Sequence, residues 1–157
     1  MQSLDQSGRM INDKWVLSDK VDLRSGDQWA VFPLSILQNM ENFPERTTQI
    51  GVWAPAGTLL DDLVPYLGSL SIIMIEFPKF RDGRGFTLAR NLRAQAHYDR
   101  EIRAVGHLLP DQFRALIQCG FTSVELSKEH PQEQWIKILT KGSTASTGPL
   151  LQRLLKR

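Results

Sequence analysis

Short apolar runs alternate with amphipathic stretches over the second two thirds of the chain. The apolar runs are rich in strand-forming residues and occupy positions 50–54, 71–77, 102–105 and 123–126. The run at 71–77 is almost continuously apolar, which is typical of a strand buried on both faces of a parallel sheet. Helical periodicity follows each run, beginning near Thr58, Thr87, Pro110 and Pro131. These repeated strand–helix units predict an α/β fold with a small parallel sheet, either open or half of a barrel.

Cap signals set the expected limits of these helices. Thr58 with Asp61 three residues later is typical of a capping box, and Pro110 suits the first turn of a helix. Gly120 is expected to end the third helix in a left-handed conformation, and Gly142 is expected to end the fourth.

The first third of the chain lacks this regular alternation. Residues 1–13 are polar and aperiodic, so we expect a flexible N-terminus. Residues 14–48 contain two apolar clusters and a short helical stretch at 34–40. We interpret them as an N-terminal attachment to the four strand–helix units at 50–141, so that residues 14–141 form a single α/β domain.

Residues 142–157 combine a linker with a tail. Residues 142–149 are rich in Gly, Ser and Thr, which is typical of a flexible linker. Residues 150–157 are basic and amphipathic but too short to hold a helix alone in water. The tail is therefore expected either to dock or to stay mobile.

Composition suits a soluble domain and excludes several classes of protein. With 41% apolar and 23% charged residues, the 157-residue chain is neither disordered nor collagen-like. No apolar run approaches the ~20 residues that cross a bilayer, and no apolar signal segment is present. We therefore expect a cytoplasmic protein with no membrane partner. The single cysteine, Cys119, is interpreted as a small buried hydrophobe.

Charge is distributed unevenly, although the net charge is only +2. Residues 1–76 carry 5 Lys/Arg against 10 Asp/Glu, residues 77–114 carry 8 against 4, and residues 115–157 carry 6 against 3. This pattern favours a local basic site over a uniformly basic surface, and we expect no nucleic-acid partner.

A basic loop follows the most apolar run, at the place where parallel sheets bind ligands. Residues 77–86 hold the cations Lys79, Arg81 and Arg84 together with Asp82, Gly83 and Gly85. The cations predict a cradle for sulfate, sulfite or phosphate, since arginine holds such oxyanions in a bidentate fork. We expect the glycines to allow close backbone approach, and a helix beginning at Thr87 to add free N–H groups. The alternative is a solvated turn whose arginines pair with Asp82 and Glu76.

A second candidate segment, residues 103–112, follows the third apolar run. Its candidate ligand-binding residues are Arg103, His107 and Asp111. His107 lies where the strand should end, so it can face a ligand or act as a hydrogen-bonded structural group. Asp111 can cap its own helix or anchor an arginine of the first loop.

Motifs for familiar cofactors are missing from the sequence. There is no P-loop, no G-x-G-x-x-G fingerprint, no H-E-x-x-H and no C-x-x-C, so we predict no bound cofactor and no metal site. No Ser-His-Asp arrangement can be drawn, and the catalytic residues stay unassigned.

Several of these residues together resemble a family of uncharacterised bacterial proteins. The resemblance covers residues 50–127 and rests on 77–86, 89–93, 101–106, Asp111 with Gln112, and Cys119-Gly120-Phe121. The genes of this family lie beside those of assimilatory sulfite and sulfate reduction, so the resemblance implies a role in sulfite reduction. The family usually has an acidic residue at the position of His107 and a basic one at the position of Pro110.

Three functions are compatible with this resemblance. The preferred one is an accessory protein of assimilatory sulfate and sulfite reduction that binds a sulfur oxyanion, a phosphosulfate nucleotide or the sulfite reductase through the basic loop. The second is a small oxidoreductase of sulfur assimilation that uses a partner's cofactor. The third is a scaffold for sulfite reductase or another sulfate-assimilation enzyme. The missing cofactor motifs favour a binding role over an enzyme.

Overall fold

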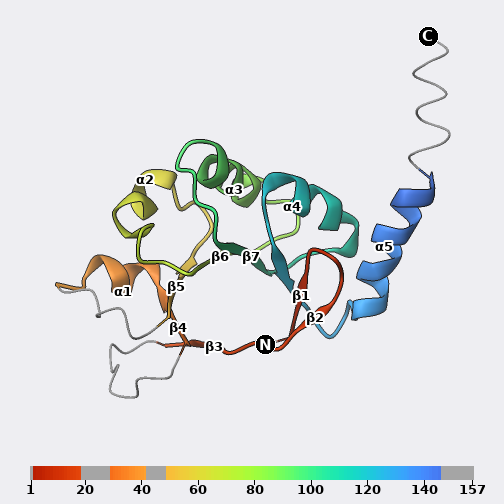
Figure 1. Cartoon of the computed structure of the whole chain (residues 1–157), viewed down its shortest axis with the longest axis horizontal. Coiled ribbons are helices and arrows are strands. Elements are labelled where there is room, and N and C mark those ends of the chain that lie inside the picture. The colour runs from red at the N-terminus through yellow and green to blue at the C-terminus, as the bar shows by residue number, and fades with distance from the viewer. Residues whose placement is uncertain (1, 19–28, 42–48, 146–157) are drawn as a thin grey trace, which may run out of the picture.

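The fold is built on one eight-stranded sheet that curls into a half-barrel (Figure 1). The structure is a computed structural model, and it describes residues 2–18, 29–41 and 49–145. The strands are β1 (Ser3–Asp5), β2 (Met10–Ile11), β3 (Trp15–Leu17), β4 (Trp29–Pro33), β5 (Ile50–Ala54), β6 (Ile72–Phe77), β7 (Glu101–Gly106) and β8 (Ser123–Glu125). Their order in the sheet is β2-β1-β8-β7-β6-β5-β4-β3. Strands β3 to β8 are parallel and follow one another in chain order, and β1 and β2 add an antiparallel edge.

Helices cover one face of this sheet (Figure 1). They are α1 (Leu34–Gln38), α2 (Leu60–Leu63), α3 (Arg84–Ala94), α4 (Phe113–Cys119) and α5 (Gln132–Ala145), with short 3-10 turns at Val64–Tyr66 and Pro110–Gln112. Helix α5 lies at the end of this layer, where Trp135 packs edge-on against Phe113 with ring centroids 5.3 Å apart. The Trp135 indole N–H donates to the carbonyl oxygen of His130, which ties α5 to the loop that precedes it.

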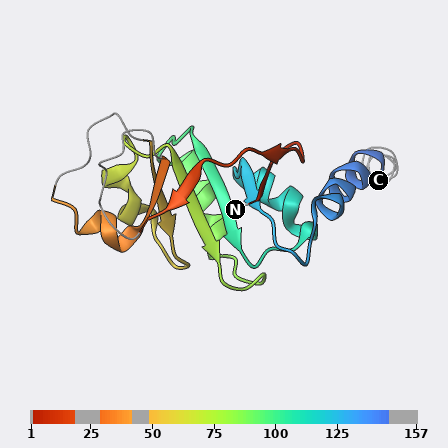
Figure 2. The ribbon, with the colours of Figure 1, turned by 90° about the horizontal axis from the view of Figure 1, so that it is seen from below.

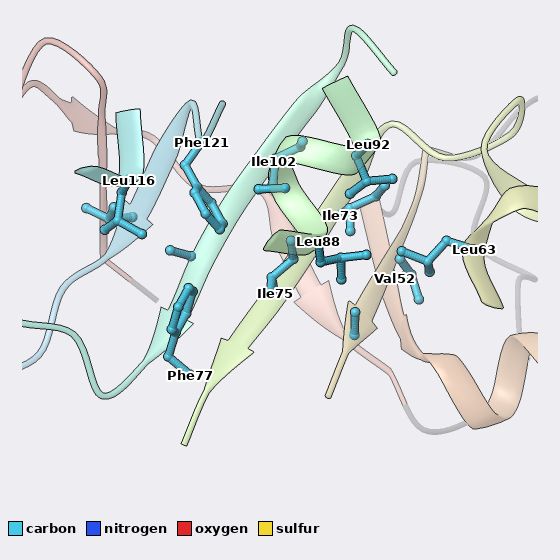
Figure 3. Close-up of a cluster of buried hydrophobic side chains, with 14 of the residues drawn as sticks. Val52, Leu63, Ile73, Ile75, Phe77, Leu88, Leu92, Ile102, Leu116 and Phe121 are labelled. Atoms are coloured by element: carbon cyan, nitrogen blue, oxygen red, sulfur yellow. The ribbon is translucent and has the colours of Figure 1, made fainter. Parts of the chain in front are cut away.

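The main core lies between the sheet and these helices. Alternate residues of β6, Ile73, Ile75 and Phe77, point toward the helices, and Leu88 and Leu92 of α3 belong to the same cluster (Figure 3). All five side chains are buried. Burying one such side chain stabilises a fold by about 1.5–3 kcal/mol. The packing of this layer therefore holds the strands in place, and with them the positions at which they end.

The opposite face of the sheet has a smaller apolar cluster, made by Val31, Ile72, Met74 and Val105. The chain between β2 and β3 crosses this face on its way from one edge of the sheet to the other (Figure 2). On this crossing segment, Asp13 accepts hydrogen bonds from the buried Arg103. Both faces of the central strands are therefore covered, as the almost continuously apolar run of β6 predicts.

The predicted α/β fold is confirmed, and four strand–helix units follow one another as expected. The sheet has six parallel strands in chain order, because the N-terminal attachment at residues 14–48 contributes β3 and β4 to it. Within residues 1–13, where the pattern predicted no element, β1 and β2 form a hairpin that pairs with β8. Leu4 is completely buried in this hairpin, which explains why it holds its place on the sheet.

Three features at the ends of helices differ from the prediction. Helix α3 begins at Arg84, three residues before Thr87. At the start of α2 the carboxylate of Asp62, not Asp61, accepts the backbone N–H of Leu59, at 2.9 Å. Helix α5 continues through Gly142, because a single glycine weakens a helix without ending it.

The other helix ends are confirmed or lie outside the described chain. Gly120 ends α4 with φ of +109°, as expected. Of the predicted linker and tail, residues 146–157 lie outside the described residues. None of the described helices combines the length and apolar character that a membrane span requires.

Candidate functional site

The loops after β5, β6, β7 and β8 meet along one edge of the sheet, here called the carboxyl-end rim. They comprise residues 55–59, 78–83, 107–109 and 126–131. Because neighbouring parallel strands end together, side chains from these four loops come close without being close in sequence. The rim is therefore the part of the fold where ligand-binding groups are expected.

A hollow of about 580 Å³ lies between the loops that follow β6, β7 and β8. Its lining includes Phe80, His107, Glu125, Lys128, Glu129 and His130. This rim hollow falls within the roughly 300–1,000 Å³ that small-molecule sites occupy. The surface also offers carboxylates, imidazoles, an amine and an aromatic ring, which together suit a ligand with both polar and apolar parts.

Within the loop after β6, Asp82 and Arg84 form a close ion pair. The guanidinium Nη2 and Nε of Arg84 donate to the two carboxylate oxygens of Asp82 at 2.6–3.2 Å, and the Arg84 backbone N–H donates to the same carboxylate at 3.1 Å. These hydrogen bonds lower the pKa of Asp82 to about 2 and raise the pKa of Arg84. The pairing that the sequence offered as the alternative interpretation of Asp82 thus forms between these two residues.

The paired Arg84 also approaches the neighbouring loop. Gly57 has φ of +87°, and a Cβ placed there would lie 3.0 Å from Nη1 of Arg84. Arg84 therefore sits between the loops after β5 and β6, next to a smaller hollow of about 190 Å³ that is separate from the rim hollow. Its guanidinium is exposed, but two of its three nitrogens already bind Asp82.

The other two cations of this loop are exposed. Lys79 and Arg81 both lie on the surface, and the guanidinium carbon of Arg81 is 5.4 Å from the centroid of the Phe80 ring. Phe80 lines the rim hollow and is 43% exposed, unusually accessible for an aromatic side chain. The basic loop thus carries two exposed cations, one before and one after Phe80 in the chain, and the accessible Phe80 ring lines the hollow.

Backbone and side-chain contacts hold the loops after β6 and β7 together. The backbone N–H of His107 donates to the carbonyl of Phe77 at 2.7 Å. The amide of Gln112 donates to the carbonyl of Phe80 at 2.6 Å and accepts the backbone N–H of Leu109 at 3.0 Å. Gln112 thereby fixes the position of Phe80 relative to the rim hollow.

The two glycines of the basic loop have different surroundings. Gly83 has an ordinary φ of −81°, and nothing lies within 4 Å of a Cβ placed on it. Gly85 is buried in the first turn of α3, where a Cβ would lie 2.5 Å from the Phe77 ring. Its small size serves the packing of α3 on β6 rather than the approach of a ligand.

The three candidate residues of the second segment lie in three different places. His107 is exposed and lines the rim hollow. Arg103 is completely buried on the face of β7 away from the helices, and its guanidinium binds Asp13 at 2.7 Å and Glu101 at 2.8 Å. Asp111 is exposed beside a separate hollow of about 310 Å³ next to α5. Arg103 and Asp111 are thus not part of the rim hollow.

Several residues of the rim hollow were not identified from the sequence. Glu125, Lys128, Glu129 and His130 come from the end of β8 and the loop after it. The carboxylate of Glu125 accepts the backbone N–H of Gly106 at 3.2 Å, which fixes this side chain at the edge of the hollow. The rule that ligands bind after parallel strands could have found them, because their loop follows the predicted strand at 123–126.

Metal-ligating and thiol chemistry is sparse in the part of the chain that the structure describes. No group of three or more His, Cys, Asp or Glu side chains there is arranged to hold a metal ion. Cys119 is buried, and its sulfur accepts a hydrogen bond from Nε of Arg90 at 3.3 Å.

Comparison with known proteins adds a family but no closer relative. The searches of curated proteins and of solved structures gave no match. A family model described as "Bacterial protein of unknown function (DUF934)" matches residues 51–147. These residues make up more than half of the chain and include β6 to β8, all of β5 except Ile50, and the whole carboxyl-end rim. The chain therefore belongs to the DUF934 family of bacterial proteins of unknown function.

Proposed function

We propose that this protein is an accessory protein of sulfite and sulfate reduction that binds a sulfur oxyanion at the carboxyl-end rim. The observation that carries the proposal is the exposure of Lys79 and Arg81, the chain neighbours of Phe80, which lines a hollow at the ligand-binding end of a parallel sheet. The link to sulfite reduction is supported by the sequence resemblance at residues 77–86 and 101–106. A binding role, rather than a reaction, is proposed because no catalytic arrangement has been assigned.

The charges at the rim support binding of an anion. Lys79 and Arg81 carry two positive charges that the described hydrogen bonds and ion pairs leave exposed, while the charge of Arg84 is balanced by Asp82. His107 and His130 add imidazole groups to the lining of the hollow. A sulfur oxyanion can accept hydrogen bonds from both loop cations at once.

Isothermal titration with sulfite and with sulfate tests the proposal. The double variant Lys79→Ala/Arg81→Ala should lose binding by at least about 10-fold, since one charge-assisted hydrogen bond contributes roughly 1.5–3 kcal/mol. The matched control is Arg9→Ala, which removes an exposed cation from the turn between β1 and β2. It should bind like the unmodified protein.

Two outcomes would contradict the proposal. One is an affinity for both anions that is unchanged in the double variant, which would place binding away from the basic loop. The other is the absence of any binding by the unmodified protein. If sulfite reductase instead binds the unmodified protein in a pull-down and not the double variant, the basic loop is a docking surface for the enzyme rather than an anion site.

A further inference from the structure

The rim hollow is larger and chemically more varied than a bare oxyanion requires. Its volume of about 580 Å³ is that of a drug-sized ligand, whereas sulfite or sulfate has only a few heavy atoms. An anion held by Lys79 and Arg81, next to Phe80 in the chain, would leave the hollow to another part of the same ligand.

One wall of the hollow offers a stacking surface. The Phe80 ring is accessible, and the backbone carbonyl of Phe80 accepts a hydrogen bond from the side-chain amide of Gln112. Arg81 lies near the ring, with its guanidinium carbon 5.4 Å from the ring centroid. An aromatic ring flanked by a guanidinium is the arrangement on which nucleobases stack.

The lining of the hollow also includes carboxylates that a bare anion would avoid. Glu125 and Glu129 both line the hollow, and Glu125 is held by the backbone N–H of Gly106. Carboxylates repel a sulfur oxyanion, but they accept hydrogen bonds from sugar hydroxyls, as acidic residues do in dinucleotide sites. The carboxylates therefore favour a ligand that carries hydroxyl groups between its aromatic part and its anionic end.

We propose that the rim hollow binds a nucleotide, with the base on Phe80, the ribose hydroxyls facing Glu129 and Glu125, and the anionic end at the cations of the rim. This inference rests on the proposed function and specifies its ligand class. A nucleotide that carries a sulfur oxyanion at its 5′ end satisfies both the basic loop and the remainder of the hollow. Lys128 and His107 supply further donors for the anionic end.

Titration calorimetry with four probes tests this inference. The probes are adenosine 5′-phosphosulfate, AMP, adenosine and inorganic sulfate. Both nucleotides should bind at least about 10-fold more tightly than sulfate, because they also use the stacking and hydroxyl contacts. Adenosine should bind more weakly than AMP, because it lacks the anionic end.

Variants distinguish the parts of the ligand. Phe80→Ala should weaken both nucleotides by roughly 5- to 150-fold and leave sulfate unchanged, and Phe80→Trp should restore nucleotide binding. Glu129→Gln should weaken AMP and strengthen sulfate, because it removes a hydroxyl acceptor and a negative charge together. Val16→Ala, which shortens an exposed apolar side chain on β3, is the control and should change nothing.

Each failure has a distinct meaning. If sulfate binds as tightly as AMP and Phe80→Ala changes neither, the nucleotide inference is overturned while the anion site stands. If AMP binds but Phe80→Ala leaves its affinity unchanged in a variant with a normal melting curve, the nucleotide lies elsewhere and the inference is again overturned. If none of the four probes binds, the nucleotide inference fails together with the anion site.

Discussion

The two ends of strands β6 to β8 use their cations in opposite ways. At the amino end, the Arg93 guanidinium donates to the carbonyls of Gly120, Tyr98 and Arg100 at 2.6–3.0 Å, and Arg100 donates to the carbonyl of Leu70 at 2.9 Å. At the carboxyl-end rim, Lys79 and Arg81 are exposed on either side, in the chain, of Phe80, which lines the rim hollow. Arg93 and Arg100 thus donate to backbone carbonyls at the amino end, while Lys79 and Arg81 are exposed to solvent at the rim.

Burial explains the difference. The Arg93 side chain is partly buried, which lowers its pKa, and its donors are used by carbonyls at the ends of neighbouring elements. The buried Tyr98 hydroxyl donates to the carbonyl of Leu70, and burial raises its pKa. The amino end is thus built for stability, while the rim keeps its polar groups available, a division that parallel α/β barrels also show.

The largest effect on stability is expected at Arg103, which lies between the two ends. Arg103→Met should destabilise the fold by about 3–5 kcal/mol, because it leaves the carboxylates of Asp13 and Glu101 without their buried partner. Urea unfolding measures the change. The double variant Asp13→Asn/Arg103→Met should recover part of the loss. A loss below about 1 kcal/mol would show that the crossing segment does not depend on this ion pair.

The next effect is expected at the amino end itself. Arg93→Met should cost about 2–4 kcal/mol. Three carbonyls lose a charged donor worth roughly 1.5–3 kcal/mol each, but because Arg93 is only partly buried, water replaces part of this hydrogen bonding. Anion binding at the rim should be unchanged in the folded variant. Unfolding curves and calorimetry on the same sample check both statements. Weaker anion binding with normal stability would contradict the assignment of Arg93 to stability alone.

A smaller effect on stability is expected at Gly106, where the rim requires a backbone conformation that favours glycine. Gly106 has φ of +102°, and a Cβ there would clash with the carbonyl oxygen of Phe77. Gly106→Ala should therefore cost about 1–3 kcal/mol through backbone strain. Gly83→Ala is the matched control, since Gly83 has an ordinary φ and open space around it. Equal melting temperatures for the two variants would contradict this account.

The smallest effect is expected for the Asp82–Arg84 ion pair, and it is measured by titrating the Asp82 carboxyl. The pKa of Asp82 lies near 2 because Arg84 donates to its carboxylate through side chain and backbone. The contribution of this pair to stability is present above the ordinary value of 3.8 and is lost as the pH falls through about 2. Carboxyl carbon NMR should show the midpoint near pH 2, and Arg84→Lys should raise it. A midpoint near 3.8 in the unmodified protein would show that the pair does not form in solution.

The sequence predicted the strands better than the surroundings of the site. The apolar runs at 50–54 and 71–77 correspond closely to β5 and β6, because buried parallel strands need uninterrupted apolar residues. The sequence did not predict the two short N-terminal strands, β1 and β2, because elements of 2–3 residues are too short to show a periodic pattern. The position of β1 is set by pairing with β8, for example Leu4 with Val124, and β2 in turn pairs with β1.

At the candidate site, the sequence located the basic loop but not the surrounding contacts. Arg103 resembles a ligand-binding residue because it is basic and near a strand end, yet the alternation of β7 turns its side chain to the face crossed by Asp13. The contacts of Gln112 with Phe80 and of Glu125 with Gly106 join separate loops. No local pattern encodes such contacts, because they depend on how the strands are arranged in the sheet.

Amide chemical-shift mapping tests the central claim, that the carboxyl-end rim is the binding surface. Isotope-labelled protein is titrated with sulfite and with adenosine 5′-phosphosulfate. The account predicts shifts confined to residues 79–84, 106–109 and 125–130, with none at Arg93, Tyr98 or Gly120 of the amino end. Shifts at the amino end, or a spectrum that neither ligand changes, would contradict it.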